Sequence, residues 1–285
     1  MRWKSSKNAD VKRLDLLHPI VSGNKFYKLK YNIEHAKHLG VERIVTFGGA
    51  YSNHLHAAAW ACKENNLQLI ALIRGEEPQA LSPTLQDIIN WGAQVEYITR
   101  DAYAHKATED FKIWVFDTFG PSFIIPEGGA NFLGVNGCME ILASEDSVYS
   151  DVFCSAGTGT MASGLALSLK PHQTLHVVSA LKGGGMKQQM FDLIKYFLMD
   201  DEAASEVLKN VVFHEDFHFG GYAKTTPELE DFIANQKAQF DLPLDKVYTG
   251  KLFKAFLEIE KNNVFEKALI IHSGGLQGNR TISAS

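Results

Sequence analysis

The sequence predicts an α/β protein built on parallel sheet that helices cover on both faces. Short runs of Ile, Val, Leu and Phe alternate along the chain with longer segments of helical periodicity. The runs are apolar at successive positions, as residues 67–73 illustrate. Strands buried on both faces read in this way, and the helices between them supply the crossover connections. With 285 residues, the chain can bury a sizeable core as one large domain or two small ones.

The expected elements follow from local patterns. A helix over about 27–39 has an apolar face and ends at Gly40, and a strand over 44–47 and a helix over about 53–64 come next. Ser82-Pro83 supplies an N-cap and a proline for the first position of a further helix. The other strands expected are 67–73, 95–98, 123–125, 152–154, 175–178 and 268–271, with helical stretches between them.

Composition restricts the class of protein. Hydrophobic residues make up 45% of the chain and charged residues 21%, as in ordinary globular proteins. A net charge of −5 gives no reason to expect nucleic acid or an anionic membrane as partner. No apolar run approaches the roughly 18 residues of a membrane span, and no signal peptide is visible at the start. We expect a cytoplasmic protein whose isolated cysteines, Cys62, Cys138 and Cys154, are buried reduced thiols.

A lysine at the start of the first helix is a candidate for covalent chemistry. The segment Ser22-Gly23-Asn24-Lys25 presents the amine from a tight turn. A lysine that forms a Schiff base must reach its neutral form, and neighbouring positive charge lowers its pKa. Lys28 lies one turn further on and is the alternative choice. Against both stands the ordinary interpretation of a lysine, a solvated surface charge.

A second candidate site is the turn Gly48-Gly49-Ala50-Tyr51-Ser52-Asn53-His54, which joins strand 44–47 to a helix. Its unpaired backbone N–H groups can bind an anion, and Ser52 adds a hydroxyl. The plain alternative is an N-cap formed by Ser52 or Asn53. Together with Lys25, the turn indicates an enzyme that handles an amine and holds a carboxylate, which points to pyridoxal 5′-phosphate (PLP) chemistry.

A third segment, Ala156-Gly157-Thr158-Gly159-Thr160, follows strand 152–154 and opens an apolar helix. Small residues at a helix N-terminus leave N–H groups free for phosphate, and the two threonines add hydroxyl donors. The spacing also satisfies a loose dinucleotide fingerprint, which requires an acidic residue about 20 positions later. The chain has Val178-Ser179-Ala180 there, so a single phosphate is the better interpretation.

The run His214-Glu215-Asp216-Phe217-His218 matches the HExxH pattern of zinc proteases. That pattern requires a helix, because only there do residues four apart face one metal. The apolar run before it and Gly220-Gly221 after it favour strand or loop. We therefore predict no metal site.

Three further motifs add hydroxyl groups: Gly220-Gly221-Tyr222, Val247-Tyr248-Thr249-Gly250-Lys251 and His272-Ser273-Gly274-Gly275. Each is weak alone, since Tyr222 and Tyr248 are also plausible packing rings and Thr249 and Ser273 plausible caps. Their order and spacing along the chain, taken together with the other motifs, make them evidence for a shared site.

The ordered set of motifs from about Val11 to Gly278 resembles the 1-aminocyclopropane-1-carboxylate (ACC) deaminase and D-cysteine desulfhydrase family. These are PLP enzymes of the tryptophan synthase β-subunit fold, fold type II. The matching segments are Ser-Gly-Asn-Lys25, Gly-Gly-Ala-Tyr-Ser52-Asn53-His54, Glu127-Gly-Gly-Ala-Asn131, Gly157-Thr-Gly-Thr160, Gly-Gly-Tyr222, Val-Tyr248-Thr-Gly-Lys and His-Ser273-Gly-Gly. The chain departs from the better-studied branch at Ala50-Tyr51 and at His56.

The resemblance implies a role for each matching residue. Lys25 is implied to form the Schiff base with PLP, and Asn53 to contact its 3′-oxygen. Ser52, Asn53 and His54 are implied to hold the substrate carboxylate. The cofactor-binding residues further implied are Gly157, Thr158, Gly159 and Thr160 at the phosphate, with either Thr249 or Ser273 at the pyridine nitrogen. Tyr222 and Tyr248 are implied to line the substrate pocket, and Ser52 and both tyrosines are counted as catalytic with Lys25.

The resemblance implies a two-domain enzyme, with a small domain over 28–135 and a larger PLP-binding domain made of 1–27 and 136–285. Thr249 and Ser273 resemble the desulfhydrase branch, because ACC deaminases carry Glu and Leu at those places. The expected reaction is therefore α,β-elimination from a small D-amino acid, D-cysteine giving pyruvate, sulfide and ammonia. ACC deaminase and amino-acid racemase remain alternatives, as does a PLP-holding protein without turnover. The resemblance also implies a homodimer.

Overall fold

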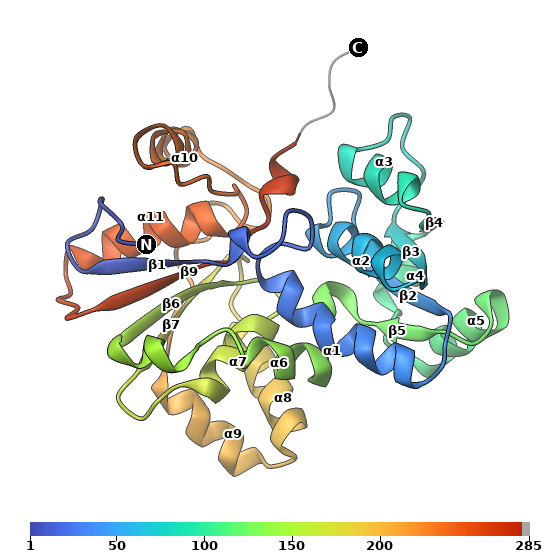
Figure 1. Cartoon of the computed structure of the whole chain (residues 1–285), viewed down its shortest axis with the longest axis horizontal. Coiled ribbons are helices and arrows are strands. Elements are labelled where there is room, and N and C mark those ends of the chain that lie inside the picture. Colours follow the sequence, from blue (N-terminus) through green and yellow to red (C-terminus); the bar gives the residue numbers. More distant parts are fainter. Residues whose placement is uncertain (281–285) are drawn as a thin grey trace.

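Two parallel sheets organise the chain, which a computed structural model describes over residues 1–280 (Figure 1). The five-stranded sheet has the order β1-β9-β6-β7-β8, and every pair in it is parallel. Its strands are β1 (Ala9–Arg13), β6 (Asp151–Ala156), β7 (Thr174–Ser179), β8 (Val211–His214) and β9 (Ala268–His272).

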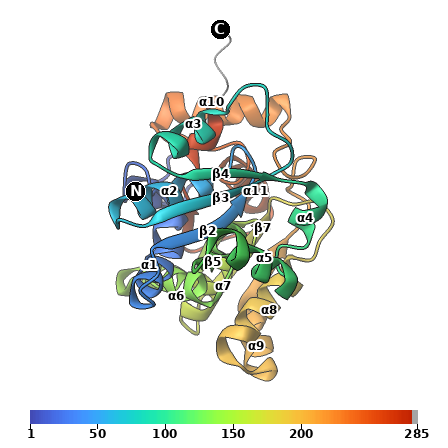
Figure 2. The same cartoon turned by 90° about the vertical axis from the view of Figure 1, so that its right-hand side faces the viewer.

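The four-stranded sheet has the order β4-β3-β2-β5 and is also parallel throughout. Its strands are β2 (Arg43–Gly48), β3 (Gln68–Arg74), β4 (Gln94–Ile98) and β5 (Phe123–Ile125). This sheet lies in the right half of Figure 1, and its twisted strands face the viewer in Figure 2. The α/β prediction with parallel sheets is thereby confirmed.

Helices cover both faces of each sheet, as the buried clusters show. The helices are α1 (Asn24–His38), α2 (Asn53–Glu64), α3 (Pro83–Asn90), α4 (Arg100–Ala104), α5 (Glu109–Phe119), α6 (Phe132–Cys138), α7 (Thr160–Ser168), α8 (Met186–Leu198), α9 (Asp201–Val207), α10 (Pro227–Phe240) and α11 (Thr249–Glu260). In the larger sheet, α6, α7 and α8 pack on one face and α11 on the other. In the smaller sheet, α1, α2 and α3 lie opposite α4 and α5.

Most of the expected elements form at or near their predicted bounds. Helix α2 and strand β5 have the predicted bounds, and Ser82 caps α3 by accepting a hydrogen bond from the Leu85 N–H. Helix α1 was expected from residue 27 but begins at Asn24, because Gly23 with φ of 67° serves as its N-cap. Lys25 therefore belongs to the first turn of the helix. Strand β1 was not predicted, since its apolar and polar residues give no continuous buried run.

The predicted domain boundary stays a prediction, although all four strands of the smaller sheet lie between Arg43 and Ile125. The three cysteines are buried and free, as expected. Within residues 1–280, none of the helices combines the length and the apolar character that crossing a membrane requires.

Candidate functional site

One cavity of about 890 Å³ collects the predicted site residues from six separate parts of the chain. The turns that follow the carboxyl ends of β2 in the smaller sheet and of β6 and β9 in the larger sheet all line this cavity. All the predicted site residues but Thr249 line this cavity: Lys25, Ser52, Asn53, His54, Gly157, Thr158, Gly159, Thr160, Tyr222, Tyr248 and Ser273. Its size is that of typical small-molecule sites.

Lys25 lies in the cavity wall with its amine held in place. Its Nζ donates to Asn24 Oδ1 at 2.7 Å. Loss of hydration lowers the pKa of Lys25 to about 7, and the positive charge of Lys28 contributes to the shift. A substantial fraction of the amine is therefore neutral near pH 7, as nucleophilic attack on a carbonyl requires.

Lys28 has different surroundings, which separates it from Lys25. Its Nζ donates to the carbonyl of Gly128 at 3.1 Å and to Thr158 Oγ1 at 3.4 Å. The side chain is buried, and burial lowers the pKa of Lys28. A buried ammonium against the 157–160 segment is suited to balancing the charge of a bound phosphate.

The turn after β2 leads into α2 and lines the cavity, and its role as an anion cradle stays a prediction. Ser52 is the N-cap of α2 and accepts from the Leu55 N–H at 3.2 Å. Gly48 must be a glycine because an added Cβ would lie 2.6 Å from Ser52 Oγ. In the described chain, the buried Asn53 Oδ1 and His54 Nδ1 have no hydrogen-bond partner. Orphaned buried polar atoms beside a cavity indicate a place where a polar ligand completes the site.

The imidazole of His54 acts as an acceptor at Nδ1. The Thr46 hydroxyl donates to the carbonyl of Ile125 at 2.7 Å, so it must accept from His54 Nε2 at 2.8 Å. Burial and the charges of Lys25 and Lys28 lower the pKa of His54 to about 3, so the ring is neutral. Its contribution to binding an anion is then the backbone N–H in the first turn of α2.

The segment after β6 has the geometry of a phosphate cradle. Gly159 with φ of 72° is the N-cap of α7 and supplies no side chain, so the first N–H groups of the helix stay available. The hydroxyls of Thr158 and Thr160 lie 2.9 Å apart. At Gly157, an added Cβ would lie 2.9 Å from the ring of Tyr248.

Two tyrosines also line the cavity. The rings of Tyr222 and Tyr248 lie 6.4 Å apart at 66°. Burial raises the pKa of both phenols, and hydrogen bonding to Tyr222 raises that of Tyr248 further. Both are therefore protonated donors at neutral pH.

The two predicted candidates for the pyridine nitrogen differ in position. Thr249 is fully buried and does not line the cavity. Its hydroxyl donates to Asp245 Oδ1 and accepts from the Asp245 N–H, each at 2.7 Å. Ser273 lines the cavity, and its Oγ is 3.5 Å from Ser155 Oγ.

Charged residues to which sequence reasoning assigned no role also line the cavity, Asp245 and Arg74 among them. Asp245 accepts the N–H groups of Val247, Tyr248 and Thr249 at 2.7–2.9 Å and thus caps α11. An aspartate before an amphipathic run is a recognisable cap signal, which could have located it. Arg74 and Glu127 also line the cavity, following β3 and β5. Its position after a buried strand is the only sign of Arg74 in the sequence, whereas Glu127 begins the matching segment Glu127-Gly-Gly-Ala-Asn131.

The HExxH run lies outside this cavity and is not helical. His214 ends strand β8 and the rest of the run is loop, as predicted. His214 Nε2 instead contacts His176 Nδ1 at 3.0 Å. Over residues 1–280, no group of three or more His, Cys, Asp or Glu side chains is arranged to hold a metal ion.

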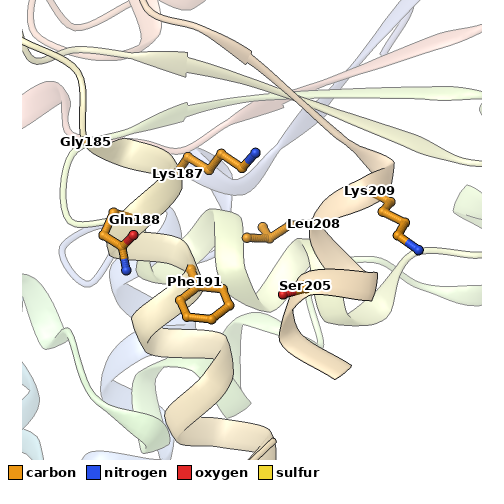
Figure 3. A pocket seen from close by; sticks show the side chains of 7 residues that line it. All are labelled: Gly185, Lys187, Gln188, Phe191, Ser205, Leu208 and Lys209. Carbon is orange, nitrogen blue, oxygen red and sulfur yellow. The ribbon is translucent and has the colours of Figure 1, made fainter. Parts of the chain in front are cut away.

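A second hollow between α8 and the α9 segment lacks the features of the first. Figure 3 shows the side chains of its seven lining residues, Gly185, Lys187, Gln188, Phe191, Ser205, Leu208 and Lys209. In this view the amine of Lys209 points away from the hollow, and it pairs with Glu206. None of the predicted site residues lies there.

Comparisons with known proteins show what the whole chain is similar to. No family model matches the chain. A Pyrococcus horikoshii protein provisionally named 1-aminocyclopropane-1-carboxylate deaminase is 30% identical over 286 residues, which cover 94% of this chain and 84% of that protein. The mitochondrial bifunctional D-cysteine desulfhydrase/ACC deaminase of Arabidopsis thaliana is 26% identical over 291 residues, which cover 94% of this chain and 72% of that protein.

Solved structures give the same result for the fold. The crystal structure of an ACC deaminase homologue aligns with a TM-score of 0.78 at 27% identity, covering 95% of this chain and 85% of the other. A serine racemase of Dictyostelium discoideum aligns with a TM-score of 0.62 at 14% identity, covering 96% and 88%. The second likeness concerns the fold alone, which is the fold type II arrangement expected from the sequence.

Proposed function

The chain belongs to the family of ACC deaminases and D-cysteine desulfhydrases, and from that premise we propose that it eliminates sulfide from D-cysteine. The single observation that carries the choice within the family is the pair of hydroxyl residues, Thr249 and Ser273, where ACC deaminases carry Glu and Leu. Without a carboxylate at the pyridine nitrogen, the cofactor withdraws fewer electrons, which suits elimination of a good leaving group.

The enzymes of this family are PLP-dependent, and the cavity residues fit that cofactor. Lys25 supplies an amine that is partly neutral at pH 7, and Lys28 a buried positive charge beside the 157–160 cradle. The orphaned Oδ1 of Asn53 adds a polar atom for the ring. We assign the pyridine contact to Ser273, because the Thr249 hydroxyl is already occupied by Asp245.

When bound, PLP provides a sink for the electron pair released as the Cα–H bond breaks. The chain's own residues bind and orient the substrate. The N–H groups at the start of α2 hold the carboxylate, and Ser52 presents its hydroxyl beside the same point. The neutral amine of Lys25 is the proposed base that takes the Cα proton at Nζ, with Ser52 the alternative. Tyr222 and Tyr248, both protonated, are placed to donate to the departing sulfur.

The proposed reaction balances without a further reactant except water. Breaking the Cα–H and Cβ–S bonds forms a carbon–carbon double bond and releases hydrogen sulfide. Hydrolysis of the resulting enamine then consumes one water and gives pyruvate and ammonia. No oxidation or reduction is involved.

The first experiment is an absorbance spectrum of the purified protein before and after D-cysteine is added, with pyruvate and sulfide assayed in the same sample. A visible band that shifts while both products appear in equal amounts is the expected result. A band that shifts without pyruvate would retain the cofactor and reject the substrate. Absence of the band after PLP is added would reject the assignment of Lys25.

ACC deamination and racemisation are the competing activities. ACC ring opening would release 2-oxobutanoate and ammonia, whereas racemisation would exchange the Cα hydrogen with solvent and give the opposite enantiomer without a keto acid. The double variant Thr249→Glu, Ser273→Leu should gain ACC activity if these positions determine substrate choice. No gain would remove the basis for preferring D-cysteine. Binding of PLP without turnover of any of these substrates would instead support a degenerate, non-enzymatic homologue.

We also propose the homodimer that the resemblance implies, and the cytoplasmic location likewise stays a proposal. Sedimentation should give twice the chain mass of 31.7 kDa. A monomeric mass across the micromolar range would contradict it.

A further inference from the structure

A lysine outside the cavity is held against the loop that carries Tyr222. Lys251 on α11 is 0% exposed, which is rare for a lysine. Its Nζ donates to the carbonyl of His218 at 2.8 Å and to that of Gly221 at 2.7 Å. Burying an ammonium is costly unless its donors are satisfied, so these two bonds define where the loop can lie.

The two carbonyls begin two consecutive turns, 218–221 and 221–224, and Tyr222 lies within the second. The His218 carbonyl also accepts the Gly221 N–H at 3.0 Å, and the Gly221 carbonyl accepts the Lys224 N–H at 3.1 Å. Lys251 therefore joins both turns through one charged group.

The loop needs such support because its backbone is strained. Four of its residues have positive φ: Phe219 at 48°, Gly220 at 92°, Gly221 at 112° and Ala223 at 54°. Phe219 and Ala223 carry a Cβ, which makes this conformation unfavourable without tertiary contacts. Tyr222 itself is 55% exposed, so its own packing does not hold it.

The same helix carries the partner tyrosine. Tyr248 immediately precedes α11, and its N–H donates to Asp245 Oδ2 at 2.9 Å. Lys251 follows three residues later. One helix end thus fixes Tyr248 through its cap and Tyr222 through the lysine.

From this geometry we infer that Lys251 is a positioning residue that sets the place of Tyr222 in the active site. The inference rests on the proposed function only in that Tyr222 faces the substrate. Lys251 touches neither substrate nor cofactor, so its effect on catalysis passes through the 218–224 loop.

The test compares PLP-loaded Lys251→Met with Lys254→Met, one turn further along α11. Lys254 is partly exposed and pairs with Glu228 and Glu258, so the control removes a lysine from the same helix without touching the loop. Amide hydrogen exchange over 218–224 should be about tenfold faster or more in Lys251→Met and unchanged in Lys254→Met. Equal exchange in both variants would overturn the inference.

A double-mutant cycle on kcat/KM for D-cysteine tests the route of action. Lys251→Met should lower kcat/KM by about tenfold or more in the wild-type background and by less than about twofold in Tyr222→Ala. Equal losses in both backgrounds would show that Lys251 does not act through Tyr222. If Lys251→Met fails to fold, Lys251→Gln, which keeps one donor group, replaces it in the cycle. Its loss of kcat/KM should be smaller than that expected for Lys251→Met, and it should again be larger in the wild-type background than in Tyr222→Ala. If the wild type does not turn over D-cysteine, the proposed function fails, while hydrogen exchange still decides the role of Lys251.

Discussion

Lys25 and Lys28 are chemically alike, and their surroundings assign them different tasks. Lys25 contacts only a side-chain amide and faces the cavity, whereas Lys28 points at the phosphate cradle. The charge of Lys28 contributes to the lowered pKa of Lys25, while Asp245 opposes the shift. Besides burial, the charge of Lys28 thus helps to keep the amine of Lys25 neutral.

The attachment of PLP to the cofactor-free protein should depend on pH through Lys25. Only the neutral amine attacks the aldehyde, so the rate should fall about tenfold per unit below a midpoint near pH 7 and level off above pH 8. Stopped-flow absorbance measures this rate. Lys28→Met removes the positive neighbour, so the midpoint should move to higher pH. Lys30→Met, which removes an amine paired with Glu140, should leave it in place. An unmoved midpoint in Lys28→Met would contradict the electrostatic coupling.

At the scale of elements, α11 begins with a cap that serves the active site. Asp245 accepts three backbone N–H groups and the Thr249 hydroxyl, and it is 1% exposed. The cap holds Tyr248 at the cavity wall. Because all these bonds form with one buried carboxylate, the helix end depends on a single residue.

Asp245→Ala should destabilise the fold by about 2–4 kcal/mol, more than an ordinary cap, since it leaves buried donors unpaired. Thr226→Ala is the matched control, because Thr226 caps α10 through the Leu229 N–H alone. That change should cost about 1 kcal/mol. Urea unfolding at equal PLP saturation measures both. Equal losses would mean that the additional bonds of Asp245 contribute nothing.

Three neighbouring strands share a polar stripe beneath α11. Asp151 on β6 contacts His176 on β7, which contacts His214 on β8, with each pair of atoms 3.0 Å apart. The ring of Phe153 stacks on His176 at 4.2 Å. Burial, together with repulsion from His176, lowers the pKa of His214 to about 4.

This stripe predicts a loss of stability in acid. Below pH 6.5, His214 is protonated in the unfolded chain, whereas in the folded chain it stays neutral until the pH approaches 4. Acid therefore favours the unfolded chain, and the free energy of unfolding should fall as the pH drops from about 6.5 to about 4. If His214 were fully buried, the fall in the free energy of unfolding would be at most roughly 3 kcal/mol. Because the side chain is partly exposed, we expect a fall of about 1–2 kcal/mol. Urea unfolding of His214→Gln should show a flatter pH dependence, whereas the surface variant His172→Gln should not. Parallel curves for wild type and His214→Gln would contradict the assignment.

At the scale of the whole molecule, the segment that follows the last strand of the larger sheet contacts a helix that packs on the smaller sheet. Arg280 follows β9 and the short helical segment Leu276–Asn279, and its Nη1 lies 2.7 Å from Asp87 Oδ2 on α3. The same carboxylate oxygen lies 3.0 Å from His56 Nε2 on α2. These contacts bridge the segment that follows β9 and the helices that cover one face of the smaller sheet.

A double-mutant cycle of Asp87→Asn with Arg280→Met should give a coupling energy of about 0.5–1 kcal/mol in urea unfolding, because both side chains are partly exposed. The exposed pair Lys195–Asp201 within the α8–α9 region serves as control and should couple less. A coupling no larger than that of the control would deny the bridge a role in stability.

The amino-acid sequence by itself determined the alternation of strand and helix and the three turns that meet at the cavity. These features depend on neighbours in the chain: apolar runs make strands, and glycine with a hydroxyl residue leaves N–H groups free at a helix start. Lys25, Ser52 and Gly157 could therefore be located without coordinates. Strand β1 could not, because its pairing with β9 joins residues about 260 positions apart.

Only the tertiary structure decided which of several similar groups faces the cavity. It turns Ser273 toward the cavity while Thr249 is bound by Asp245, and it sets Lys251 beneath the loop of Tyr222. The orientation of these side chains depends on contacts between segments that are distant in sequence. The residues next to a hydroxyl or an amine in the chain do not indicate which distant group it will contact. Short sequence motifs predict which chemical groups the site contains, whereas the packing of the whole chain determines where each side chain points.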